Sequence, residues 1–81
     1  MHAPDFWPKI VEQIEEKLQL GLLEQVRAVI EASFTGGELA LAVATTEAYE
    51  FFGAHVNQQR LIILARPVIT IDRVSVRYQG E

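Results

Sequence analysis

Five glutamates are the residues of this sequence whose type and spacing come nearest to acid–base chemistry. Glu12, Glu15 and Glu16 lie close together, and Glu47 and Glu50 have the i,i+3 spacing of neighbours on a helix. A catalytic carboxyl group needs burial or a nearby charge to move its pKa toward the working pH. The expected place of these glutamates is a polar helix face in water, which supplies neither.

Nucleophiles and metal ligands are equally sparse. Ser33 and Ser75 have no histidine partner in the sequence pattern, and no cysteine is present as a nucleophile or zinc ligand. His2 and His55 belong to no ligand spacing such as H-E-x-x-H. The segment TGGE at residues 35–38 lacks the spacing of a phosphate-binding loop, and its glutamate would repel phosphate. We therefore expect no enzymatic activity, no metal and no cofactor.

Arginines in the last third of the chain are the strongest chemical signal. The four are Arg60, Arg66, Arg73 and Arg77, whereas residues 1–50 carry nine acidic and three basic side chains. Such a cluster could contact the phosphates of a single-stranded nucleic acid, with strongly salt-dependent affinity. Against this stand the net charge of −4 and the lack of a G-x-x-G loop of the KH type or an aromatic RNP pattern.

Adjacent large apolar residues predict a different role, contact with another protein. Phe6 and Trp7 open the first predicted helix, and one of the two is expected to face outward. The same holds for the pair Leu22 and Leu23, and Phe51 stands beside another phenylalanine. Single exposed apolar residues are ordinary, but clustered aromatic residues at a helix start are typical of a contact patch.

The length of 81 residues allows one small domain, expected over residues 1–81 with an ordered core of about residues 5–79. Apolar residues make up 49% of the chain, which is typical of a folded protein. The longest dense apolar run, Leu61–Ala65, is too short to span a bilayer, and no signal-peptide pattern opens the chain. We therefore expect a cytoplasmic domain that does not associate with membranes.

Apolar spacing predicts a first helix that Asp5 caps, with Gly21 as its end or as a tight link to the next helix. Its apolar face comprises Trp7, Ile10, Val11, Ile14 and Leu18. A short second helix is expected to about Arg27. Apolar and polar residues then alternate, which favours a strand over residues 28–34, although this segment also fits a continued helix.

Gly36 and Gly37 predict a tight hairpin, because a two-residue primed turn needs positive φ, which glycine adopts freely. A second strand with alternating side chains follows over residues 39–43. The alternation over residues 73–78 predicts a last strand whose basic side chains face outward.

Between these strands, Thr45 or Thr46 can cap a third helix. The helix is expected to continue through Leu64 and to end before Pro67, although Leu61–Ala65 also fits a strand. The predicted order is α-α-β-β-α-β, an α+β domain whose helices pack on one face of a small three-stranded sheet.

A set of residues along the chain follows the pattern of a known family. The set comprises Phe6-Trp7, Leu18, Thr35-Gly36-Gly37 with the following Glu38-Leu39-Ala40-Leu41, Phe51, and Val74-Ser75-Val76-Arg77. With the element order, this pattern resembles the N-terminal domain (domain I) of the bacterial replication initiator DnaA, which has a KH-like fold. The C-terminal domain of the DNA polymerase III γ/τ subunit is similar in layout and also opens with a tryptophan.

The sequence departs from the DnaA pattern at four places. Val26 stands where the family usually has a tryptophan, and Ala44-Thr45 where it usually has Pro-Asn. Leu22 and Glu47 fall at positions where the family carries helicase-contact residues, commonly acidic and aromatic respectively.

The resemblance implies a non-catalytic protein–protein interaction module of bacterial DNA replication initiation. Such a module self-associates weakly and recruits replication proteins: the initiator, the replicative helicase or a regulatory protein. Phe6 and Trp7 are expected to form one contact surface, and Leu22, Leu23 and Glu47 a second. The alternatives are a γ/τ-type polymerase-binding domain and a KH-like domain that binds single-stranded nucleic acid through the four arginines.

Overall fold

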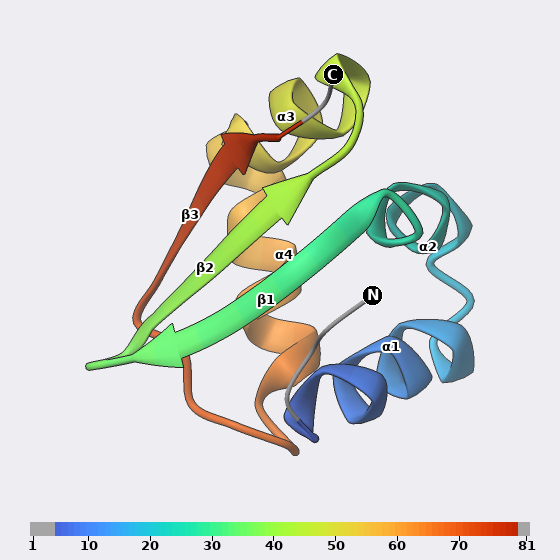
Figure 1. The fold of residues 1–81 in the computed structure, drawn as a ribbon. Coiled ribbons are helices and arrows are strands. Elements are labelled where there is room, and N and C mark those ends of the chain that lie inside the picture. The colour runs from blue at the N-terminus through green and yellow to red at the C-terminus, as the bar shows by residue number, and fades with distance from the viewer. Residues whose placement is uncertain (1–4, 80–81) are drawn as a thin grey trace.

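The structure is a computed structural model that describes residues 5–79. Its elements in chain order are α1 (Phe6–Glu16), α2 (Leu20–Val26), β1 (Val29–Thr35), β2 (Glu38–Val43), α3 (Thr46–Gly53), α4 (His55–Ala65) and β3 (Arg73–Tyr78), as Figure 1 shows. Within this part of the chain four helices pack on a three-stranded mixed sheet, which confirms the predicted α+β class. Residues 61–65 are helical, and residues 28–34 are almost entirely strand, as favoured by the sequence.

The strands lie in the order β1-β2-β3, with β2 in the centre. β1 and β2 are antiparallel, and the φ angles of 57° and 83° at Gly36 and Gly37 fit the predicted hairpin. β2 and β3 are parallel, with Leu39 beside Val74. Parallel neighbours need a long crossover connection, which α3 and α4 supply.

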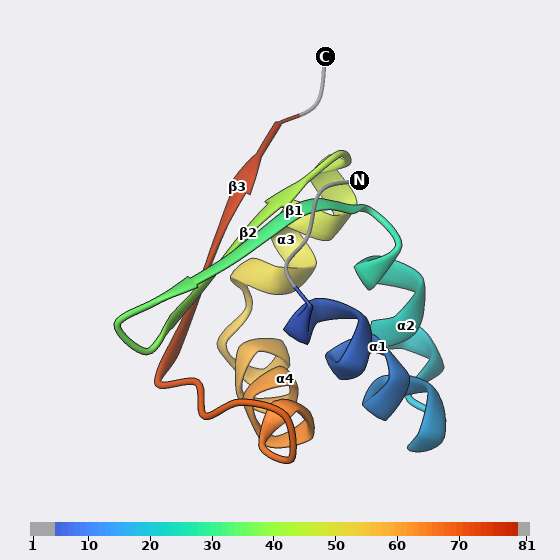
Figure 2. The same cartoon turned by 60° about the horizontal axis from the view of Figure 1, so that its bottom comes forward.

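The helices gather on one side of the sheet (Figure 2). Alternate residues of the central strand, Leu39, Leu41 and Val43, are fully buried, because strand side chains alternate between faces and these meet the helices. Trp7 and Phe52 are the largest of the other fully buried side chains among the described residues. The opposite face of the sheet carries the remaining, mostly polar positions, and no helix within residues 5–79 covers it.

Helix α1 ends at Glu16, earlier than predicted. The amide of Leu18 donates to the carbonyl of Glu15 at 3.1 Å, and the amide of Gln19 donates to the carbonyl of Ile14 at 3.2 Å. This pair of bonds is the Schellman pattern, which places the residue after the helix cap in the left-handed region. Leu18 holds that position with φ of 56°.

Two of the predicted helix-end signals are wrong. Asp5 makes no capping hydrogen bond, because its backbone is already helical and a capping side chain needs an extended residue. Gly21 lies inside α2 and does not end α1. Thr45, by contrast, is extended and its hydroxyl accepts a hydrogen bond from the amide of Ala48 at 3.1 Å, so this predicted cap is confirmed.

The predicted third helix is divided at Ala54, whose extended backbone (ψ 129°) separates α3 from α4. The side-chain amides of Asn57 and Gln58 donate to the carbonyls of Phe51 and Phe52 at 2.9 and 2.6 Å. Carbonyls at the end of a helix lack intrahelical partners, and these two amides satisfy a pair of them. These two carbonyls therefore keep hydrogen-bond partners although the helix is interrupted.

Candidate interaction surface

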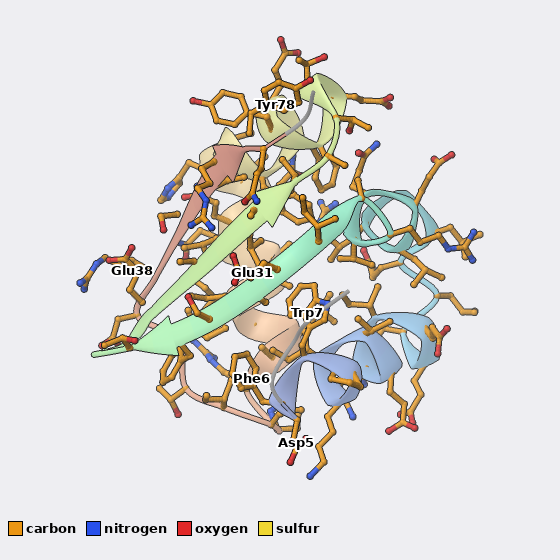
Figure 3. The ribbon with its side chains drawn as sticks, in the orientation of Figure 1. Asp5, Phe6, Trp7, Glu31, Glu38 and Tyr78 are labelled. Carbon is orange, nitrogen blue, oxygen red and sulfur yellow. The ribbon has the colours of Figure 1, made fainter. Side chains whose placement is uncertain are left out.

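Trp7 lies in the hydrophobic core, so the prediction that it forms a contact surface is wrong. Only 1% of this residue is exposed. Its neighbour Phe6 is partly buried and meets Phe34 edge-on, with 6.0 Å between ring centroids; Figure 3 labels the two α1 residues. Phe51 is partly buried in the same way, 5.2 Å from the ring of Phe52. Phe6 and Phe51 are thus partly buried and pack against the core.

The second predicted surface is only partly present. Leu22 is buried in the core, so its predicted contact role is wrong as well, whereas Leu23 is partly exposed and Glu47 is exposed. The side-chain amide of Gln25, itself nearly buried, donates to Oε2 of Glu47 at 3.0 Å. Glu47 therefore holds the first turn of α3 against α2.

The four arginines of the predicted nucleic-acid surface lie on two separate parts of the molecule. Arg60 lies on α4, and Arg66 follows directly after that helix. Arg73 and Arg77 lie on β3, on the outer face of the sheet, where each is paired with a glutamate. The structure thus contains no single basic surface made by all four.

The outer face of the sheet is a small network of opposite charges. Glu38 accepts hydrogen bonds from the Ser75 hydroxyl at 2.7 Å and from Nε of Arg73 at 3.0 Å, and Arg77 Nη2 donates to Glu31 at 2.8 Å. The hydrogen bond from Ser75, followed by that from Arg73, holds the pKa of Glu38 below its ordinary value. A carboxylate held ionised in this way is no proton donor at neutral pH. On this face Glu38 is therefore ionised at neutral pH, and Arg73 and Arg77 are paired with carboxylates.

An open groove of about 410 Å³ lies between α4 and the link from α1 to α2, residues 17–19. We call these the α4 groove and the α1–α2 link. The α4 groove is lined by Gln19, Val56, Gln59, Arg60, Ile63 and Leu64. Val56 and Ile63 are 63% and 56% exposed, on the side of α4 away from its buried residues Leu61, Ile62 and Ala65. The groove therefore exposes apolar side chains with one charged group among them.

Two more exposed leucines lie close to Gln19 in the sequence, one in the α1–α2 link and one at the start of α2. Leu18 and Leu20 stand on either side of the lining residue Gln19, and they are 76% and 68% exposed. The sequence prediction missed them because Leu18 follows Ile14 by four residues and so fits the apolar face of α1. The spacing of Val56 and Ile63 could have indicated a shared apolar surface, since residues seven apart lie on the same face of a helix.

Residues 5–79 contain no group of three or more histidine, aspartate or glutamate side chains that could hold a metal ion. No helix among these residues is long and apolar enough to cross a membrane. His2 lies outside the described residues. Among the hollows on the described surface, we take the α4 groove as the candidate site because it exposes Val56 and Ile63.

Comparison of the chain with protein-family models, curated proteins and solved structures gives no match. The resemblance to DnaA domain I, and the weaker one to the γ/τ domain, therefore rests on the residues quoted above. The observed order differs from the predicted α-α-β-β-α-β order only in the division of the third helix.

Proposed function

We propose that this chain is a non-catalytic protein-interaction module. The observation that carries the proposal is the exposure of two large apolar side chains, Val56 and Ile63, in one groove. Two further exposed leucines, Leu18 and Leu20, flank the lining residue Gln19 in the sequence. Apolar surface gathered in this way is costly in water and is typical of a site that another protein covers. The groove residues replace Trp7 and Leu22 as the contact residues.

For the setting of this interaction we propose bacterial DNA replication initiation, with the initiator, the replicative helicase or a regulatory protein as partner. The support is the residue pattern shared with DnaA domain I and an element order compatible with it. A polymerase-binding role of the γ/τ type is the second candidate within the same class. Direct binding of single-stranded nucleic acid has less support, because Arg73 and Arg77 are already paired with carboxylates.

An affinity capture from nuclease-treated lysate of the source organism tests the proposal. The baits are the wild type, a Val56→Ser/Ile63→Ser double variant and a Tyr49→Ser control, since Tyr49 is an exposed aromatic residue outside the groove. We expect wild type and control to retain the same replication protein and the double variant to lose it. Capture that is equal for all three baits would remove the groove from the function. Capture that requires nucleic acid would favour the nucleic-acid alternative.

A further inference from the structure

We propose that the α4 groove binds an acidic amphipathic helix of a partner protein. The proposal rests on the interaction role above and specifies the chemistry of the partner. Three observations carry it: the spacing of the groove residues along α4, the charge of Arg60 and the exposed side chain of Leu18.

The exposed residues of α4 follow one helical face. Val56, Arg60 and Ile63 stand at positions i, i+4 and i+7, which extend over about 10 Å, or two turns. The α1–α2 link with Gln19 forms the opposite wall. A two-turn trough with apolar side chains at this spacing matches the way helices bury an apolar face in a partner's groove.

Arg60 determines the charge of the partner. It is the one charged residue that lines the groove, and it belongs to none of the ion pairs formed by residues 5–79. The other polar lining residues, Gln19 and Gln59, are uncharged. A carboxylate on the apolar edge of an incoming helix would give the guanidinium a charge-assisted partner.

The same residue argues against a second copy of this chain as the occupant. Two identical copies meet through a symmetric contact in which each patch faces itself. Two α4 grooves placed face to face would bring one Arg60 toward the other, and the groove lining supplies no carboxylate to separate them. A helix of different sequence avoids this repulsion.

Leu18 is an independent sign that this edge of the molecule is covered by a partner. Its position after the helix cap, with φ of 56°, is one that glycine occupies without strain and leucine does not. Its side chain is also 76% exposed. The Schellman hydrogen bonds at the end of α1 explain the backbone angle, whereas contact with a partner's apolar face would account for the exposed side chain.

A selection from displayed 16-residue peptides of random sequence tests the proposal without assuming the occupant. The wild-type chain is the target, and the Val56→Ser/Ile63→Ser variant removes peptides that bind elsewhere. We expect the enriched peptides to share apolar residues at i, i+3 or i+4, and i+7 with an adjacent Asp or Glu. The synthetic peptide should become helical on binding, and amide chemical shifts should change in α4 and in the α1–α2 link.

Charge exchange at Arg60 gives the sharper readout. Arg60→Gln should weaken binding of the selected peptide by up to about fivefold, the range of an exposed ion pair. Arg60→Glu should weaken it further, and a peptide with Lys in place of its acidic residue should recover the loss. Arg66→Gln is the matched control, because Arg66 is an exposed arginine next to α4 that does not line the groove.

Enrichment of basic or extended peptides, or no enrichment over the variant target, would overturn the proposal. Sedimentation of the wild type as a dimer that Ile63→Ser dissociates would also overturn it, in favour of a second copy. In each of these cases, lysate capture that depends on Val56 and Ile63 would leave the interaction role standing. Capture indifferent to those two residues would instead reject the interaction role at this groove.

Discussion

Glu31 and Arg77 form an ion pair across the central strand of the sheet, with 2.8 Å between Oε1 and Nη2. Both stand beside Ala42 in the strand register, Glu31 on β1 and Arg77 on β3. Ala42 is only 1% exposed, although it lies on the face that no helix covers. The two charged side chains thus shield the middle of this face and neutralise one another.

This pairing predicts how the chain responds to nucleic acid. A Glu31→Gln/Glu38→Gln double variant frees Arg77 and Arg73 and removes two negative charges. We expect it to bind a single-stranded oligonucleotide more tightly than the wild type does, with affinity that falls steeply as salt rises. Fluorescence anisotropy at low and high salt measures both quantities. Tight binding by the wild type that Arg77→Ala abolishes would contradict the pairing and favour the nucleic-acid role.

The lowered pKa of Glu38 predicts a pH dependence of stability. Because folding favours the ionised carboxylate, its contribution is present above the unfolded value, about 4.3 for glutamate, and is lost as the pH falls through the lower folded pKa. Wild type should therefore exceed Glu38→Gln in free energy of unfolding at pH 7, and the difference should be smaller at pH 3. Urea unfolding at both values measures it. A difference that is constant with pH would show that ionisation of Glu38 contributes nothing.

The two hairpin glycines provide a matched pair of variants. Both have positive φ, but a Cβ at Gly36 would meet open space, whereas a Cβ at Gly37 would collide with the carboxylate of Asp72. The Gly37 carbonyl also accepts the amides of Asp72 and Arg73, which dock β3. Gly36→Ala should cost about 1 kcal/mol and Gly37→Ala about 2 kcal/mol or more. Equal losses in thermal unfolding would mean that Asp72 moves aside freely.

The burial of Trp7 predicts that its substitution affects stability and not partner contact. Trp7→Ala should destabilise the fold by about 3–5 kcal/mol, much of the stability of a domain this small. Trp7→Phe should cost less, because the buried indole Nε1 has no hydrogen-bond partner within residues 5–79. Denaturation followed by circular dichroism compares all three proteins. An unchanged midpoint for Trp7→Ala would restore this residue to the surface.

The sequence pattern determined the strands and the turn because their signals are local. Alternation over residues 39–43 and the paired glycines at 36–37 specify β2 and its hairpin without knowledge of the rest of the chain. Tertiary packing, by contrast, decides which of two adjacent apolar residues faces inward. Phe6 and Trp7 are both accommodated, because Phe34 on β1 receives the ring that would otherwise be exposed.

The groove escaped prediction because two helix boundaries carry no sequence signal. Leu18 continues the apolar spacing of α1, and no glycine marks the point where that helix stops. At Ala54, the break between α3 and α4 is stabilised by side-chain amides from the following turn, Asn57 and Gln58, an arrangement visible only in three dimensions. With both boundaries hidden, the link and the exposed face of α4 could not be placed beside each other.

Substitution of Leu18 should move stability and binding in opposite directions. Leu18→Gly removes the left-handed strain of about 1–2 kcal/mol, offset in part by the higher backbone entropy of glycine, for a net gain of about 0.5–1 kcal/mol. The same change deletes a 76% exposed apolar side chain and should weaken partner binding. Leu18→Ala retains the strain and loses the side chain, so it should weaken binding without the gain in thermal midpoint. If Leu18→Gly instead lowered the midpoint, the leucine would be serving the fold and not a partner.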